Sequence, residues 1–198
     1  MKNKILILVL LFSFGFVRSQ DCAYIVNKTD SVSGKNILTE PRGLYWNLKG
    51  VTISTSMGME DNSYFLVLDY AKVRMHGPPK FFSVRKNNIL SLVLENGEIF
   101  NLLAINDVFS RNESEEVKIV KTNPQNGFKT VEYQLQWKSE LKNARYKVTK
   151  KQLVQLSKSP VVSFEWNKIG SGDKMFKDEY DVKKKYLGSY QYLAKCIM

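Results

Sequence analysis

The strongest constraint on the fold is a series of short apolar segments, separated by turn signals, between residues 22 and 137. Many of their residues are β-branched or aromatic, and residues 128–137 alternate between apolar and polar side chains. Residues 110–116 are polar and acidic, and are expected to form a loop. The expected strands are residues 22–29, 35–39, 51–55, 64–75, 89–95, 98–103, 117–121, 128–137 and, later in the chain, 161–166.

The sharpest local signal is the dipeptide Asn96-Gly97, which lies between two of these apolar runs. Both residue types tolerate positive φ, so the pair predicts a hairpin with a type I′ turn. Strands that follow one another through such short turns are antiparallel. This part of the chain is therefore expected to form an antiparallel sheet.

The periodicity changes after residue 148. Thr149 and Gln152 form a Thr-x-x-Gln capping box, which predicts a short helix that ends before Pro160. A longer C-terminal helix is expected over about residues 178–195, because apolar residues recur there at helical spacing. With no repeat or linker, the sequence predicts one α+β domain over residues 20–198, mainly antiparallel sheet with both helices packed on it.

Residues 1–19 have the pattern of a cleaved signal peptide. Lys2 and Lys4 precede an uninterrupted run of 13 apolar or small residues, and small residues follow near Ser19. The run is shorter than the roughly 20 residues that a membrane-spanning helix requires, so no transmembrane anchor is expected. We expect the chain from residue 20 onward to be secreted or periplasmic.

The remaining chain holds two cysteines, Cys22 and Cys196, one near each end. Ser19-Gln20-Asp21 precedes Cys22, and this is not the small-residue sequence of a lipoprotein signal, so no lipid anchor is expected. An oxidising compartment favours one Cys22–Cys196 disulfide that joins the termini. The alternative is two free thiols that are buried as small apolar groups.

The positive charge is concentrated in the last third of the chain. Residues 20–137 contain 13 basic and 13 acidic side chains, whereas residues 138–198 contain 14 basic and six acidic ones. This asymmetry favours an anionic partner, either a lipid surface or an acidic glycan, although a solvated lysine-rich surface would also produce it. Among the 14 basic residues of this last third, only Arg145 is an arginine, which disfavours nucleic acid as the partner. The candidate anion-binding residues are Lys150, Lys151, Lys183, Lys184 and Lys185.

Aromatic residues offer a second kind of candidate surface. Tyr45 and Trp46 lie between Gly43 and Gly50, in a stretch without regular periodicity, and are the aromatic residues most expected to be exposed. Exposed rings stack on sugars, bases or partner side chains. The alternative is that they belong to the core.

The sequence lacks the residues that most catalytic mechanisms require. His76 is the single histidine and lies in an expected loop, and no spacing suits a metal site, a phosphate-binding loop or a dinucleotide cofactor. No catalytic residue, metal or cofactor is therefore predicted. Carboxylates could still act in pairs, as in glycosidases, but the spacing selects no pair. Those available are Asp61, Asp69, Glu95, Glu98 and Glu132.

The segment Lys28–Lys35, with its Asp-x-x-x-Gly turn, and the Leu-x-x-Leu-x-x-Ser-Pro block that ends at Pro160 resemble uncharacterised exported proteins of Bacteroidetes-type bacteria. The resemblance implies an envelope or secreted location and no particular activity. Together these observations predict an exported, non-enzymatic binding or envelope-associated protein. The alternatives are a small carboxylate-based hydrolase of envelope polymers and a structural subunit of unknown oligomeric state.

Overall fold

The structure is a computed structural model that describes residues 22–30, 34–75 and 77–198. The expected signal peptide and His76 lie outside these ranges. Antiparallel strands dominate the described residues, as the sequence predicted, and two helices of more than one turn follow late in the chain. The elements are β1 (Tyr24–Asp30), β2 (Gly34–Thr39), β3 (Arg42–Trp46), β4 (Val51–Glu60), β5 (Ser63–Arg74), β6 (Phe82–Val84), β7 (Ile89–Leu94), β8 (Ile99–Leu103), β9 (Val108–Phe109), β10 (Arg111–Thr122), β11 (Lys129–Val148), α2 (Lys150–Leu156), β12 (Val161–Gly170), η1 (Ser171–Asp173), β13 (Met175–Asp181), η2 (Lys184–Tyr186) and α3 (Ser189–Ile197).

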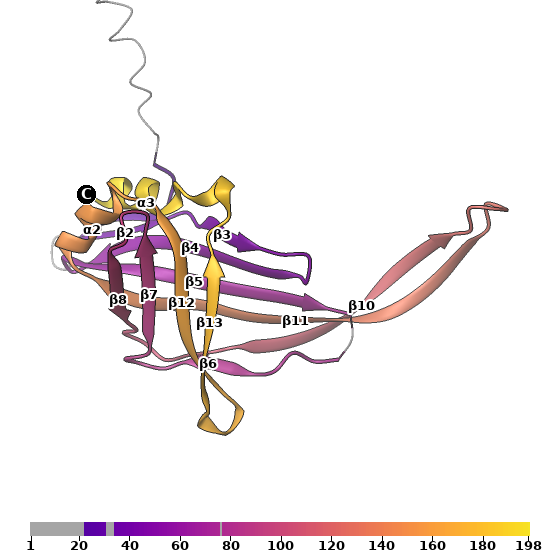
Figure 1. Cartoon of the computed structure of the whole chain (residues 1–198). Coiled ribbons are helices and arrows are strands. Elements are labelled where there is room, and N and C mark those ends of the chain that lie inside the picture. The colour runs from indigo at the N-terminus through magenta and orange to yellow at the C-terminus, as the bar shows by residue number, and fades with distance from the viewer. Residues whose placement is uncertain (1–21, 31–33, 76) are drawn as a thin grey trace, which may run out of the picture.

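The strands form two antiparallel sheets rather than one. The first has the order β1-β2-β4-β5-β11-β10, with β3 also paired to β4, and the second has the order β8-β7-β12-β6-β9, with β13 also paired to β12. Both sheets and both helices contribute to one apolar core, for example through Leu66, Phe164 and Leu193. Helices α2 and α3 lie together at one end of the strands (Figure 1).

Strand β11 is the longest element and belongs to two structural contexts. Its second half pairs with β5 inside the body, and Asn143, with φ of +67°, interrupts this register between Leu141 and Ala144. Residues 129–136 pair only with β10, and the two strands project from the body as a ribbon (Figure 1). The turn at the end of this ribbon is the farthest point from the helices.

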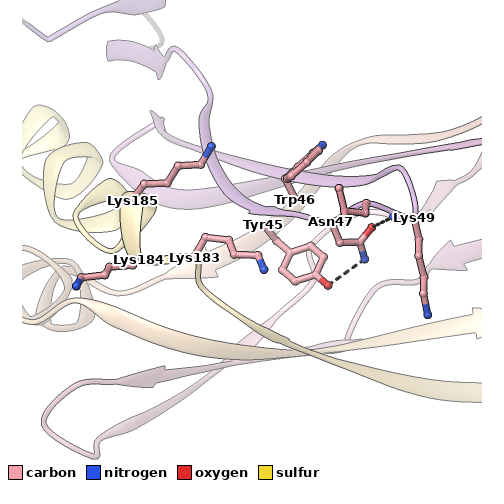
Figure 2. Close-up of a pocket in the computed structure, with 8 residues that line it drawn as sticks. Tyr45, Trp46, Asn47, Lys49, Lys183, Lys184 and Lys185 are labelled. Carbon is pink, nitrogen blue, oxygen red and sulfur yellow. Dashed lines mark hydrogen bonds between the residues drawn. The ribbon is translucent and has the colours of Figure 1, made fainter. Parts of the chain in front are cut away.

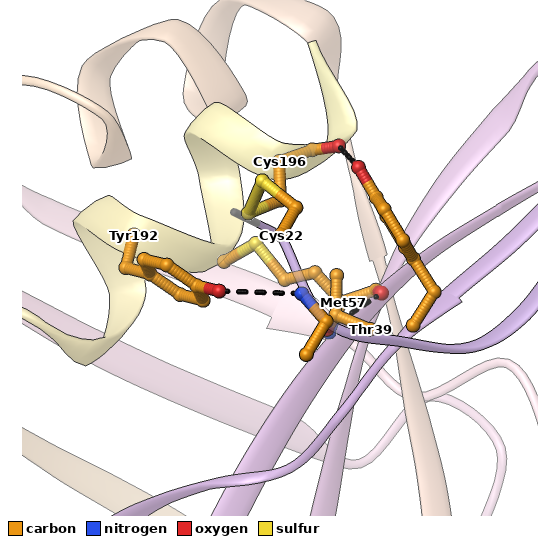
Figure 3. Close-up of a disulfide and its surroundings, with 7 residues drawn as sticks. Cys22, Thr39, Met57, Tyr192 and Cys196 are labelled. Atoms are coloured by element: carbon orange, nitrogen blue, oxygen red, sulfur yellow. Dashed lines mark hydrogen bonds between the residues drawn. A yellow bond between two sulfur atoms is a disulfide. The ribbon is translucent and has the colours of Figure 1, made fainter. Parts of the chain in front are cut away.

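The predicted disulfide is confirmed. Cys22 and Cys196 are bonded, with 5.6 Å between their Cα atoms, and the bond joins the chain just before β1 to the end of α3. Two hydrogen bonds support the same junction: the Tyr24 hydroxyl donates to the Cys196 carbonyl, and the Ala23 NH donates to the Tyr192 hydroxyl (Figure 3). The first strand is therefore fixed to the last helix.

Two local predictions are confirmed. The Thr149–Gln152 capping box is present at the start of α2, whose buried residues are Leu153 and Leu156. Strands β7 and β8 form the expected hairpin around Asn96-Gly97. However, only Gly97 has positive φ, so the turn is not the type I′ turn that was predicted.

The prediction of a loop over residues 110–116 was wrong from Arg111 onward, because residues 111–116 form the first half of β10. Polar composition does not exclude a strand whose two faces are both solvated. One of the acidic residues also has a basic partner across the ribbon, since Glu113 lies opposite Lys138 in the register with β11.

The prediction of one helix over residues 178–195 was also wrong in its first half. Residues up to Asp181 belong to β13, which pairs along one edge of β12, and α3 begins only at Ser189. Tyr180 fits the helical spacing but also a strand alternation with Phe176 and Asp178. The available edge of β12 selects the strand, and that edge could not be read from local sequence.

Candidate functional site

An open pocket lies between the β3–β4 turn and the segment that follows β13. Its volume is about 800 Å³, and eight residues line it: Tyr45, Trp46, Asn47, Leu48, Lys49, Lys183, Lys184 and Lys185. We call it the aromatic–lysine pocket (Figure 2). It brings together both aromatic candidates and three of the five lysine candidates that the sequence suggested separately.

Asn47 and Gly50 shape the β3–β4 turn. The Asn47 side-chain oxygen accepts hydrogen bonds from the backbone NH groups of Lys49 and Val51, at 3.0 and 3.1 Å. Gly50 has φ of +76°, and a Cβ there would lie 2.5 Å from the carbonyl oxygen of Val73. Only glycine fits this position without displacing β5.

The lysine segment is held against β3 by backbone contacts. The Lys183 NH donates to the Leu44 carbonyl at 3.1 Å, and the Ser189 hydroxyl donates to the Gly43 carbonyl at 3.0 Å. The Tyr186 ring packs on Gly43 so closely that a Cβ on the glycine would lie 2.8 Å from it. The position of the three lysine backbones is therefore fixed by the sheet.

A stack of aromatic rings connects the pocket to the core. Tyr45 meets the ring of Tyr180 edge-on at a centroid distance of 5.0 Å, and Tyr180 stacks on the buried Phe164 at 5.2 Å. The Asn47 amide donates to the Tyr45 hydroxyl at 3.0 Å, and the Lys183 ammonium lies 5.4 Å from the centre of the Tyr45 ring (Figure 2). Tyr45 thus has little freedom to move and forms a rigid part of the pocket.

The charged side chains of the pocket all have the same sign. Lys49, Lys183, Lys184 and Lys185 are exposed, and none forms an ion pair with a carboxylate among the described residues. Trp46 is 48% exposed and Leu48, at the tip of the turn, is 92% exposed. The pocket therefore combines cationic donors with an apolar projection.

The other two lysine candidates lie elsewhere. Lys150 and Lys151 are exposed in the first turn of α2 and do not line the pocket. The structure therefore separates the five candidates into a group of three at the pocket and a pair on α2.

The candidate carboxylates are dispersed, and none lines the aromatic–lysine pocket. Asp61 lies in the β4–β5 turn with positive φ, and Asp69 accepts a hydrogen bond from the backbone of the Asn143 interruption. Glu95 lies in the β7–β8 turn, Glu98 accepts hydrogen bonds from Gln155, and Glu132 pairs with Lys121. Glu95 and Glu98 share the β7–β8 turn, whereas Asp61, Asp69 and Glu132 lie in other parts of the fold.

Sequence reasoning missed three residues of the pocket: Asn47, Leu48 and Lys49. A usable signal was present, because an asparagine three residues before a glycine, between two strand-like segments, is typical of a tight turn. Recognising β3 would have placed Leu48 at the tip of a hairpin, where an apolar side chain has no core to enter.

A buried lysine lies behind Tyr180, the ring on which Tyr45 packs. The Lys168 side chain is 2% exposed, and its ammonium is paired with the carboxylate of Asp178. Burial lowers the pKa of Lys168 and outweighs the opposing effect of Asp178. Five rings surround the ammonium at 4.8–5.6 Å: Tyr70, Phe82, Trp166, Phe176 and Tyr180.

Comparisons with protein families, curated proteins and solved structures found no match to this chain. Among the described residues, no group of three or more histidine, cysteine, aspartate or glutamate side chains is placed to hold a metal ion. No helix in the described part of the chain has both the length and the apolar character needed to cross a membrane. The function must therefore be inferred from the geometry of the pocket.

Proposed function

We propose that this is an exported, non-enzymatic binding protein that docks on an anionic lipid surface of the envelope through the aromatic–lysine pocket. The observation that carries the proposal is the meeting of Trp46 and Leu48 with Lys49 and Lys183–Lys185 around one opening. The disulfide supports assembly in an oxidising compartment.

The charge of the pocket supports an anionic partner. Four lysines line one opening and none forms an ion pair with a described carboxylate, so their ammonium groups are available to phosphate or carboxylate groups. A lysine near an anionic membrane contributes about 1 kcal/mol to binding, and this attraction declines within a Debye length. Four such residues would give a useful but salt-sensitive affinity.

The apolar tip of the turn favours a lipid surface over an acidic glycan. Leu48 projects almost fully into solvent, and an aliphatic side chain contributes little to a sugar site. At a membrane the same side chain can enter the acyl boundary, while tryptophan prefers the headgroup level. Lysines around such a tip would contact the headgroups at the same time.

The test compares two variants of residues 20–198 that carry the same net charge. One replaces Lys183, Lys184 and Lys185 by glutamate, and the other replaces Lys150, Lys151 and Lys158, all exposed and outside the pocket, in the same way. Binding to phosphatidylglycerol-containing vesicles and to neutral phosphatidylcholine vesicles is measured by co-sedimentation at low and physiological salt.

The unmodified protein is expected to bind the anionic vesicles more tightly than the neutral ones, and less tightly as salt rises. The variant with glutamate at residues 183–185 should bind the anionic vesicles at least about a hundredfold more weakly, since three attractions of about 1 kcal/mol become repulsions. The control variant at Lys150, Lys151 and Lys158 should lose much less affinity for these vesicles. Equal losses in the two variants would mean that only total charge matters, and tighter binding to an acidic polysaccharide than to vesicles would replace lipid by glycan as the partner.

A further inference from the structure

We propose that two copies of this chain associate through strand β10, which pairs antiparallel with β10 of the second copy across a two-fold axis at Val117. The proposal rests on the ribbon that projects from the body and is independent of the aromatic–lysine pocket. Its outer strand is the end of the first sheet, so within the described residues the outer edge of β10 has no strand partner.

The ribbon is a weak element by itself. Between residues 115 and 122, β10 has only β11 as a neighbour, because β11 reaches its second partner β5 only at Trp137. A two-stranded hairpin without packing on either face is marginally stable in water. Several apolar side chains of the ribbon are also exposed, namely Val120, Phe128, Val131, Tyr133 and Leu135. A further pair of strands would convert the ribbon into a four-stranded sheet.

The distribution of charge along β10 is self-complementary. Beyond Arg111 at its start, the first half carries Glu113, Glu115 and Glu116, whereas the second half carries Lys118 and Lys121. When two identical strands pair antiparallel, the acidic half of each lies beside the basic half of the other. A strand edge with charges of one sign would instead repel a second copy.

The sequence selects one register. A two-fold axis perpendicular to the sheet must place one residue opposite its own copy, because opposed side chains share a face. With Val117 at the axis, Glu116 of each copy lies opposite Lys118 of the other, and Ser114 lies opposite Val120. Axes at residues 115, 116 or 118 would oppose two like charges directly, and an axis at Ile119 would form no ion pair.

The residues required for this pairing are available. Within the described part of the chain, neither Glu116 nor Lys118 forms an ion pair. The paired segment is limited to about residues 114–120, since the Asn112 side chain donates to the Pro79 carbonyl beside the body and Lys121 already pairs with Glu132. Both of those contacts stay intact in the proposed dimer.

The first experiment introduces Val117→Cys into the chain from residue 20 onward. The two native cysteines are bonded to each other and no described cysteine is free, so the new thiol is the only reactive one. Opposed residues in such a pair have Cβ atoms about 4.5–5.5 Å apart, and a short bifunctional thiol reagent should link two copies in high yield. In the control Thr122→Cys, the two thiols are ten residues out of register, roughly 33 Å apart, and should not be linked.

The second experiment measures the dimer dissociation constant by sedimentation equilibrium. Lys118→Glu and Glu116→Lys should each weaken the dimer by about tenfold or more, because each places two like-charge pairs across the axis. The double variant with both changes restores opposite charges and should recover the original constant. A monomeric protein at all concentrations, cross-linking at residue 122 as efficient as at residue 117, or a double variant no better than the single ones would overturn the proposal.

Discussion

Gly50 is the residue on which the shape of the aromatic–lysine pocket depends most directly. It has positive φ, and its missing Cβ leaves room for the Val73 carbonyl. We predict that Gly50→Ala lowers the free energy of unfolding by about 3 kcal/mol, because a strained backbone adds to a steric clash. Urea denaturation measures this loss.

Gly97 provides the matched control for this prediction. It has φ of +83°, but a Cβ there would meet no atom within 4 Å. Gly97→Ala should therefore cost only the backbone strain, about 1 kcal/mol. Equal losses at the two positions would show that the contact with Val73 does not shape the turn.

Lys168 and Asp178 should respond differently to substitution although they form one ion pair. Asp178→Ala leaves a buried ammonium without its counter-ion and should cost about 3–5 kcal/mol of stability. Lys168→Met places an apolar chain among the five rings, while the Asp178 side chain, 41% exposed, stays hydrated. Lys168→Met should therefore change the free energy of unfolding by no more than about 1 kcal/mol. Urea midpoints in the reverse order would mean that the ammonium is not buried as described.

At the scale of elements, the disulfide is the main constraint on β1. This strand lies at the edge of its sheet and pairs only with β2, so the bond to α3 is its strongest tertiary connection. Replacing Cys22 and Cys196 together by serine should lower the free energy of unfolding by about 2–5 kcal/mol. Denaturation in urea, with and without reductant, provides the measurement. Reductant should lower the free energy of unfolding of the unmodified protein by the same amount and leave that of the variant unchanged.

Element prediction succeeded where local chemistry was decisive. The capping box at Thr149 and the hairpin at Asn96-Gly97 each depend on residues within a few positions. It failed where the secondary structure depends on a distant segment, as for β13, which is a strand because it pairs with the free edge of β12. The start of β10 is the other failure, since residues 111–116 are polar on both faces of the strand and have no apolar periodicity to detect.

At the scale of the whole molecule, buried tyrosines should set the alkaline limit of stability. Burial raises the pKa of Tyr70 to about 12, and raises the pKa values of Tyr146, Tyr180 and Tyr190 further above the ordinary value of 10. Below pH 10 these groups are protonated in both states and their stabilising contribution is complete. Above pH 10 only the unfolded chain ionises, so stability falls as pH rises toward the folded-state pKa values.

Each of these tyrosines can contribute a slope of about 1.4 kcal/mol per pH unit, so four can remove several kcal/mol between pH 10 and 11. Lys168 acts in the opposite direction, because its lowered pKa makes stability rise with pH up to about 10.5, but it involves only one proton. Urea midpoints from pH 8 to 11.5 should therefore collapse above pH 10. In Tyr190→Phe the free energy of unfolding should fall less steeply with pH, because one fewer proton is released on unfolding. An unchanged slope would contradict this explanation.

The candidate site was predictable in its parts but not in its assembly. Composition pointed to Lys183–Lys185, and the irregular stretch around Tyr45 pointed to exposed rings. Nothing local indicated that these segments, more than 130 positions apart, lie side by side. That proximity depends on the contact of Lys183 with Leu44 and of Tyr186 with Gly43, and both follow from the tertiary fold.

The most direct test of the proposed lipid-binding surface is the tryptophan emission spectrum of the protein with anionic vesicles. Trp166 is buried, whereas Trp46 is exposed at the pocket and should pass into a less polar environment on docking. We predict a blue shift on addition of phosphatidylglycerol-containing vesicles that is absent in Trp46→Phe, although that variant still co-sediments. An emission spectrum that does not change while the unmodified protein is vesicle-bound would show that the pocket does not face the lipid, and would contradict the proposal.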